Sequence, residues 1–166
     1  SLKASIIQTN LELEDKWSSL GVVKTKSMME RAINDGDEGE IIVFPETALI
    51  FSQNEIKDWL AYIDHKAEQK NITLITGIIE REGEFKVRNR ILGLGLANSH
   101  YDKVKLVPFG EFIPFEGITG NLFDILGLQL TNTLPGEHVK SINAGNIRVS
   151  ASICYEIAFP ELIRKT

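Results

Sequence analysis

The chain has 166 residues, of which 43% are hydrophobic and 25% are charged, a balance typical of a folded domain and not of a disordered or fibrous chain. Its 23 acidic and 18 basic residues are dispersed and give a net charge of −5, so nucleic acid is not an expected partner. The single cysteine excludes an internal disulfide and a cysteine-based zinc cluster. No apolar run reaches the roughly 20 residues that a membrane span needs. We therefore expect one globular domain over residues 1–166.

The first segment of the chain predicts a strand and then a helix. Ala4, Ile6 and Ile7 are typical of a buried strand over residues 4–8. Residues 14–34 predict one amphipathic helix that ends at a turn sequence over residues 34–37. The apolar positions of this helix are Trp17, Leu20, Val23, Met28, Ala32 and Ile33.

The next segment predicts a buried strand followed by a second helix. Residues 41–44 are apolar and mostly β-branched, the pattern of a strand covered on both faces, and Pro45 ends it. Ser52 and Glu55 have the spacing of a capping box at the start of a helix. The apolar stripe of that helix consists of Ile56, Trp59, Leu60, Ile63 and Ala67.

The second half of the chain predicts two hairpins separated by a long loop. The strands are expected over residues 72–80, 85–95, about 97–104, 138–142 and 147–153. Residues 107–134 combine many apolar residues with glycines and prolines, which predicts a long ordered loop. A helix is expected to begin at Pro160, and the chain stops after less than two of its turns. Together with the absence of any leader before the first strand, this indicates a fragment of a larger protein.

The position of Cys154 is that of a possible nucleophile. It lies where the strand over residues 147–153 ends and the helix at Pro160 is about to begin, and such turns can expose a nucleophile. The alternation of the strand also places Cys154 on its more polar face, with Arg148 and Ser152. A lone cysteine is more often a small buried hydrophobic residue, so that alternative stays open.

Two other strands end in charged groups. Glu46 follows the strand over residues 41–44, at the end where α/β sheets place functional groups, and burial would make it a base. It could instead begin a helical turn, where the helix dipole favours a carboxylate. Lys103 and Lys105 leave a strand for the long loop, and a solvated surface charge is the alternative for either.

Other kinds of site find little support in the sequence. The three histidines are scattered, so a cysteine–histidine or serine–histidine pair is poorly supported. The chain contains neither a phosphate-binding glycine fingerprint nor metal-ligand spacing. We therefore expect no cofactor and no metal.

Three segments, in this order and spacing, resemble the nitrilase (carbon-nitrogen hydrolase) superfamily: residues 43–46 (VFPE), 101–103 (YDK) and 153–156 (ICYE). The resemblance covers essentially the whole chain. It implies an α/β fold, the nitrilase-like α-β-β-α sandwich, incomplete at its C-terminal end. It also implies a catalytic triad of Glu46, Lys103 and Cys154.

Within the superfamily, the chain resembles the apolipoprotein N-acyltransferase family. This resemblance rests on residues 44–49 (FPETAL), 105–114 (KLVPFGEFIP) and 154–156 (CYE), although Phe44 stands where the family commonly has tryptophan. It implies a bacterial inner-membrane enzyme with membrane spans on both sides of a periplasmic domain, of which this chain would be the first two-thirds. The implied partners are a phospholipid acyl donor, a diacylglyceryl apolipoprotein acceptor and the membrane surface.

The same resemblance implies roles for individual residues. Cys154 would attack the phospholipid ester to form a thioester, Glu46 would move the protons, and Lys103 would stabilise the oxyanions. The residues that match supporting positions of the family are Glu111, Tyr155 and Glu156. In the long loop, the candidates for a lid that enters lipid are Phe109, Phe112 and Phe115, with ordinary core packing as the alternative.

Two other functions remain open on the sequence. A soluble amidase or nitrilase of the same superfamily would use the same triad, with water as the acceptor of the acyl group. A non-catalytic interaction domain on the same scaffold is the third reading. The presence of all three triad residues together with Glu111 argues against it.

Overall fold

The structure is a computed structural model that describes residues 2–83, 86–108, 111 and 132–165. Its strands are β1 (Ala4–Ile6), β2 (Ile41–Val43), β3 (Thr73–Glu82), β4 (Lys86–Gly95), β5 (His100–Asp102), β6 (Asn132–Thr133), β7 (Ile142–Ala144) and β8 (Ile147–Val149). Its helices are α1 (Leu13–Lys16), α2 (Ser19–Asp35), α3 (Lys57–Gln69) and α5 (Pro160–Ile163), and Cys154–Ala158 forms a 3₁₀ helix. In the described residues, no helix is long and apolar enough to cross a membrane.

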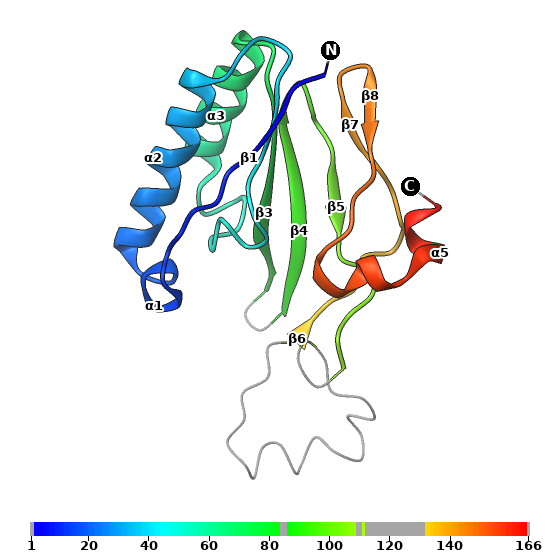
Figure 1. The fold of residues 1–166 in the computed structure, drawn as a ribbon. Coiled ribbons are helices and arrows are strands. Elements are labelled where there is room, and N and C mark those ends of the chain that lie inside the picture. The colour runs from blue at the N-terminus through cyan, green and yellow to red at the C-terminus, as the bar shows by residue number, and fades with distance from the viewer. Residues whose placement is uncertain (1, 84–85, 109–110, 112–131, 166) are drawn as a thin grey trace.

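The centre of the molecule is a mixed sheet in which β1 to β5 follow one another in chain order (Figure 1). β1, β2 and β3 are parallel, whereas β3, β4 and β5 are antiparallel. β3 and β4 form the predicted hairpin, with Thr73 opposite Gly95 and Glu82 opposite Lys86. β6 adds a short parallel pairing to β4 inside a segment for which the sequence predicts only loop.

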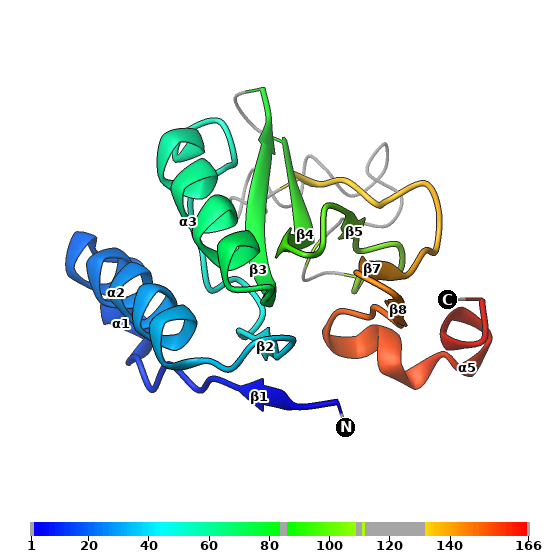
Figure 2. The ribbon, with the colours of Figure 1, turned by 90° about the horizontal axis from the view of Figure 1, so that it is seen from above.

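The two faces of the sheet carry different elements. Figures 1 and 2 show α2 and α3 side by side on one face, and the β7–β8 hairpin with α5 on the other. Met29, Ile33 and Ile63 bury the helical face against the sheet. Ile142 and Ile153 belong to a second core cluster on the opposite face. The predicted α/β class is therefore confirmed.

β2 is buried on both faces, as its sequence predicts. Ile42 belongs to the core cluster under the helices, and its neighbour Ile41 belongs to the cluster on the other face. The prediction of α3 is also confirmed, because Leu60, Ile63 and Ala67 are its buried residues. This strand and this helix each carry a regular apolar pattern that the tertiary structure does not override.

The prediction of a buried first strand is wrong. In the described part of the chain β1 pairs only with β2, and Ile6 is 84% exposed while Ala4 is exposed as well. Such an edge strand has neighbours on one side only, so part of its apolar sequence remains in solvent.

The prediction of one helix over residues 14–34 is also wrong. The helix is broken after α1, and Ser18 starts α2 by accepting a hydrogen bond on Oγ from the Gly21 N–H at 3.1 Å. Gly21 allows α1 to approach, because a Cβ there would lie 2.0 Å from the Asp15 carbonyl oxygen. The buried positions of α2 are Gly21, Thr25, Met29 and Ile33, whereas the predicted apolar positions Trp17, Leu20 and Val23 are exposed.

The Ser52–Glu55 pair forms only part of the predicted capping arrangement. The Glu55 carboxylate accepts the Ser52 N–H at 2.7 Å, and this bond lowers the pKa of Glu55 below its usual value. α3 nevertheless begins at Lys57 with Ile56 as its N-cap, so the pair closes a turn that precedes the helix.

Candidate active site

Glu46 is carried over the sheet by a turn that follows β2. The Phe44 N–H donates to the Ile75 carbonyl at 2.8 Å, and the Gly77 N–H donates to the Pro45 carbonyl at 3.2 Å. Thr47 has a φ of +52°, so the chain leaves the extended conformation immediately after Glu46. No helix begins here, and the interpretation of Glu46 as the start of a helical turn is wrong. The expected burial of Glu46 is also wrong, because the residue is exposed on this turn.

Gly77 of β3 makes this turn possible. A Cβ at Gly77 would lie 2.4 Å from the Thr47 nitrogen and 2.7 Å from the Glu46 Cα, distances that no side chain tolerates. The absence of a side chain therefore lets the backbone of Glu46 lie directly against the sheet.

Cys154 begins the 3₁₀ helix and is exposed, so it is not a small buried core residue. Its φ is +53°, a left-handed conformation that is uncommon outside glycine, and the extended residue Ile153 precedes it. The predicted sharp turn from extended chain to helix is present. The predicted strand over residues 147–153 is too long, however, because β8 ends at Val149.

Glu46 and Cys154 line one cleft of about 280 Å³. The other walls come from β2, β3 and β4, and include Ile75, Asn89 and Ile91. The carboxylate of Glu46 and the thiol of Cys154 therefore line the same cleft, although their residue numbers differ by 108. The cleft therefore holds a possible base and a possible nucleophile, the two groups that covalent catalysis needs.

Lys103 is buried, with only 1% of its side chain exposed, and it is not among the residues that line the cleft. Its Nζ donates to Glu111 Oε1 at 2.7 Å, and the second oxygen of Glu111 accepts the Val107 N–H at 2.8 Å. The Lys103 N–H donates to the carbonyl of the cleft residue Asn89 at 2.9 Å. A buried ammonium needs such a partner, so Lys103 is not a solvated surface charge.

Lys105 differs from Lys103 in its exposure and in the surroundings of its ammonium. It is exposed, and its Nζ lies 5.0 Å from the centroid of the Phe159 ring. The structure therefore separates the two lysines that the sequence leaves as alternatives.

Glu156 ties the nucleophile turn to the Lys103 segment. Its fully buried carboxylate accepts the Ile153 N–H at 2.8 Å on one oxygen. The other oxygen accepts the Val104 and Lys105 N–H groups at 2.7 and 2.8 Å. These bonds connect the backbone directly before Cys154 with the backbone directly after Lys103. Glu156 therefore fixes the position of Cys154 relative to Lys103.

Tyr101 completes the surroundings of Glu156. Its hydroxyl lies 2.9 Å from both carboxylate oxygens and donates to them. Burial and then this contact with Glu156 raise the pKa of Tyr101 well above its usual value. The hydroxyl therefore stays protonated and remains a donor throughout the physiological pH range.

The remaining predicted site residues lie elsewhere. Tyr155 points outward, about half exposed, and packs edge-on against Phe159 with ring centroids 5.2 Å apart. It is not among the residues that line the cleft. The lid candidates Phe109, Phe112 and Phe115 lie outside the described residues.

Sequence reasoning missed Asn89. Its Nδ2 donates to Glu46 Oε1 at 2.6 Å, and its Oδ1 is buried. The available signal was a single amide between Val87 and Ile91, which share one face of β4 with it.

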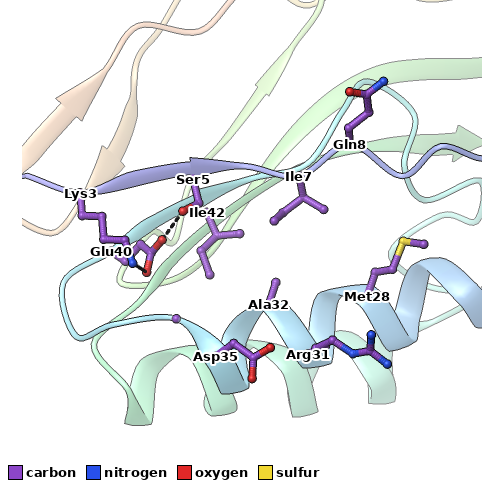
Figure 3. Close-up of a pocket in the computed structure, with 11 residues that line it drawn as sticks. Lys3, Ser5, Ile7, Gln8, Met28, Arg31, Ala32, Asp35, Glu40 and Ile42 are labelled. Atoms are coloured by element: carbon purple, nitrogen blue, oxygen red, sulfur yellow. Dashed lines mark hydrogen bonds and ion pairs between the residues drawn. The ribbon is translucent and has the colours of Figure 1, made fainter.

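A separate hollow of about 410 Å³ lies between β1 and α2 (Figure 3). There the buried Glu40 accepts the Ser5 hydroxyl, the Asp37 N–H at 2.8 Å and the Lys3 ammonium at 3.2 Å. These bonds, that from Ser5 first, lower the pKa of Glu40. Glu40, Ser5 and Lys3 thus bond to one another at the amino ends of β1 and β2, away from the cleft.

The sequence matches the family model described as carbon-nitrogen hydrolase over residues 3–166. The chain belongs to the carbon-nitrogen hydrolase family. Among the curated relatives of this chain, the apolipoprotein N-acyltransferase of Vibrio parahaemolyticus is 31% identical over 98% of this chain and 34% of that protein. That of Pseudomonas aeruginosa PAO1 is 30% identical over 96% of this chain and 32% of that protein. The chain thus spans about a third of the length of these relatives.

Solved structures place this carbon-nitrogen hydrolase chain in the same fold. A variant of the amidase from Nesterenkonia sp. AN1 has a TM-score of 0.59 at 16% identity, over 99% of this chain and 59% of that chain. A carbon-nitrogen hydrolase superfamily protein from Xanthomonas campestris has a TM-score of 0.50 at 18% identity, over 84% of this chain and 50% of that chain. The predicted nitrilase-like fold is confirmed.

Proposed function

We propose that the protein transfers an acyl chain from a phospholipid to the N-terminal amine of a diacylglyceryl apolipoprotein, through a thioester on Cys154. The observation that carries the proposal is the cleft shared by Glu46 and Cys154. The buried Lys103 bonds through its backbone N–H to the cleft residue Asn89. The curated relatives named apolipoprotein N-acyltransferase support the choice of substrates.

In the first step, Glu46 takes the proton of the Cys154 thiol. The sulfur attacks the ester carbonyl of the phospholipid, so a C–S bond forms and the ester C–O bond breaks. The proton held by Glu46 passes to the departing alkoxide. The products of this step are a lysophospholipid and the acylated Cys154.

In the second step, the amine of the acceptor attacks the thioester. A C–N bond forms, the C–S bond breaks, and Glu46 passes the proton of the amine to the departing thiolate. Each step has an oxyanion intermediate. The Lys103 ammonium has three N–H groups, one of which binds Glu111, and we propose that it also donates to the oxyanion.

An amidase reaction is the second candidate function, because the structural neighbour from Nesterenkonia is an amidase. That protein adds the acetamide moiety of fluoroacetamide covalently at its active site cysteine, which supports a nucleophilic role for Cys154. In the amidase reaction the first substrate is a small amide and water resolves the thioester. The two candidate functions therefore differ in acyl donor and acceptor but not in nucleophile.

The larger setting of this reaction is part of the proposal. We place the chain in a single nitrilase-like domain that faces the periplasm at the bacterial inner membrane, where both lipid substrates reside. Phe109, Phe112 and Phe115 are proposed to contact the lipid, and Tyr155 to support the site. Neither step uses a cofactor, because acyl transfer needs a nucleophile, a base and a group that stabilises the oxyanion.

The test supplies the purified protein with phospholipid vesicles that carry a labelled acyl chain, together with a diacylglyceryl lipopeptide. We expect the label to appear on the lipopeptide amine. Cys154→Ala abolishes the transfer, and Lys103→Met slows it by about 100- to 1,000-fold because an oxyanion partner is lost.

Lys105→Met is the matched control, since the same side-chain change at an exposed lysine leaves the transfer unchanged. Release of the labelled chain only as free fatty acid would contradict the transferase and favour hydrolysis. Transfer that survives Cys154→Ala would contradict the assignment of the nucleophile.

A further inference from the structure

Asn89 contacts two of the three proposed catalytic residues with different parts of its structure. The side-chain Nδ2 donates to Glu46 Oε1 at 2.6 Å, and the backbone carbonyl accepts the Lys103 N–H at 2.9 Å. Its position in the middle of β4 is fixed by pairing with Ile79 of β3. A single residue on a rigid strand thus contacts both Glu46 and Lys103.

The Asn89 amide is oriented by Glu46. With Nδ2 toward the carboxylate, an N–H group meets an oxygen, whereas the opposite orientation would place two oxygens 2.6 Å apart. On the other side, Oδ1 is buried and has no hydrogen-bond partner among the described residues. Within the described part of the chain, the contact with Glu46 is therefore the one side-chain hydrogen bond that orients this amide.

Folding stability does not explain an asparagine at this position. The neighbours on the same face of β4 are the apolar Val87 and Ile91, and a buried acceptor without a partner destabilises the fold. An apolar β-branched side chain would favour the strand and would carry no oxygen that needs a partner. The benefit of the amide must therefore come from its donor, which meets Glu46.

We propose that Asn89 is a positioning residue for Glu46. Its amide holds the Glu46 carboxylate in the orientation in which it faces the cleft shared with Cys154, while Glu46 itself is exposed on a turn and has no strand pairing to hold it. The proposal rests on the proposed function only in that Glu46 is the base for Cys154, and it holds for either acyl acceptor.

The test is a double-mutant cycle on the acylation of Cys154. The probe is a short-chain p-nitrophenyl ester, and the burst of p-nitrophenolate from the purified protein reports formation of the thioester. We expect Asn89→Ala to slow the burst by about 10- to 100-fold, part of the contribution of a general base. In the Glu46→Gln background, the same substitution should change the rate by less than about 2-fold, because the base it positions is already lost.

A structural role gives the opposite result. If Asn89→Ala slows the burst by the same factor with and without Glu46→Gln, the proposal is overturned. Asn89→Asp keeps the shape of the side chain, so it tests the donor even if the alanine variant folds poorly, and it should slow the burst at least as much. A burst unchanged in Asn89→Asp would also overturn the proposal. Asn98→Ala, at an exposed asparagine beyond β4, is the matched control and should leave the burst unchanged.

The experiment separates this proposal from the proposed function. The ester is neither a phospholipid nor an amide, so the cycle does not depend on the natural acyl donor. Failure to transfer a phospholipid acyl chain would contradict the transferase and leave the cycle fully interpretable. A burst of normal size with additive effects would contradict only the role of Asn89.

Discussion

Replacing Glu156 by glutamine should destabilise the protein strongly, although the side chain keeps its shape. The carboxylate accepts Val104 and Lys105 N–H groups on Oε1 and the Ile153 N–H on Oε2. A glutamine retains one oxygen, and with it at the Oε1 position the Ile153 N–H faces an NH₂ group. Glu156 is fully buried and so is its bond to Ile153, so water does not replace the lost acceptor.

The size of the effect follows from those bonds. One buried N–H without a partner costs about 1–3 kcal/mol, and each of the two remaining bonds loses about 1 kcal/mol when its acceptor becomes neutral. The total is about 3–5 kcal/mol, which lowers the Tm of a domain of this size by roughly 6–20 °C. Thermal unfolding followed by circular dichroism measures the shift.

The matched control for this prediction is Glu161→Gln, the same change at an exposed glutamate of α5. It should move the Tm by less than about 2 °C, since exposed substitutions away from special features have small effects. If Glu156→Gln shifts the Tm no more than this control, the reasoning about the buried carboxylate is refuted.

Two further predictions concern Gly77 and Tyr101. Gly77→Ala forces Thr47 away from the sheet and should slow Cys154 acylation about 100-fold in the ester burst assay. Gly39→Ala strains the backbone at a φ of +78°, but its Cβ meets nothing within 4 Å, so it should not slow acylation. Equal rates in the two variants would contradict the steric argument. Because burial and Glu156 raise the pKa of Tyr101 above its unfolded value of 10.0, its contribution to the free energy of unfolding is fully present below pH 10 and falls as pH rises above it. In urea unfolding, Tyr101→Phe should lower the free energy of unfolding less at pH 11.5 than at pH 9. Identical losses at the two pH values would count against a buried, protonated Tyr101.

The sequence predicted the parts of the fold that depend on local patterns. β2 is apolar on both faces and the β3–β4 hairpin has a clear turn between two strands, so no distant contact was needed to recognise them. The first strand is present, but the predictions that it is buried and that a single helix follows it failed. Whether a strand lies at a sheet edge depends on partners far along the chain. The break between α1 and α2 instead depends on local contacts of Ser18 and Asp15 with Gly21, which the spacing of apolar residues does not encode.

The same distinction applies to the candidate site. Glu46, Lys103 and Cys154 were selected by short motifs, and the structure places Glu46 and Cys154 at one cleft. Lys103 is buried and is linked to this cleft by its backbone bond to Asn89. The contacts of Glu156 with Val104 join residues 52 positions apart, and no local pattern predicts them. Asn89 was missed for the same reason, since its partner Glu46 is 43 positions away.

The central claim is that Cys154 carries an acyl chain taken from a phospholipid. It is tested most directly by incubating the purified protein with phospholipid vesicles in the absence of an amine acceptor and measuring the mass of the intact protein. We expect one added acyl chain that is located on Cys154, is removed by hydroxylamine and is absent from Cys154→Ala. An unmodified protein, or an acyl chain that persists in Cys154→Ala, would contradict it.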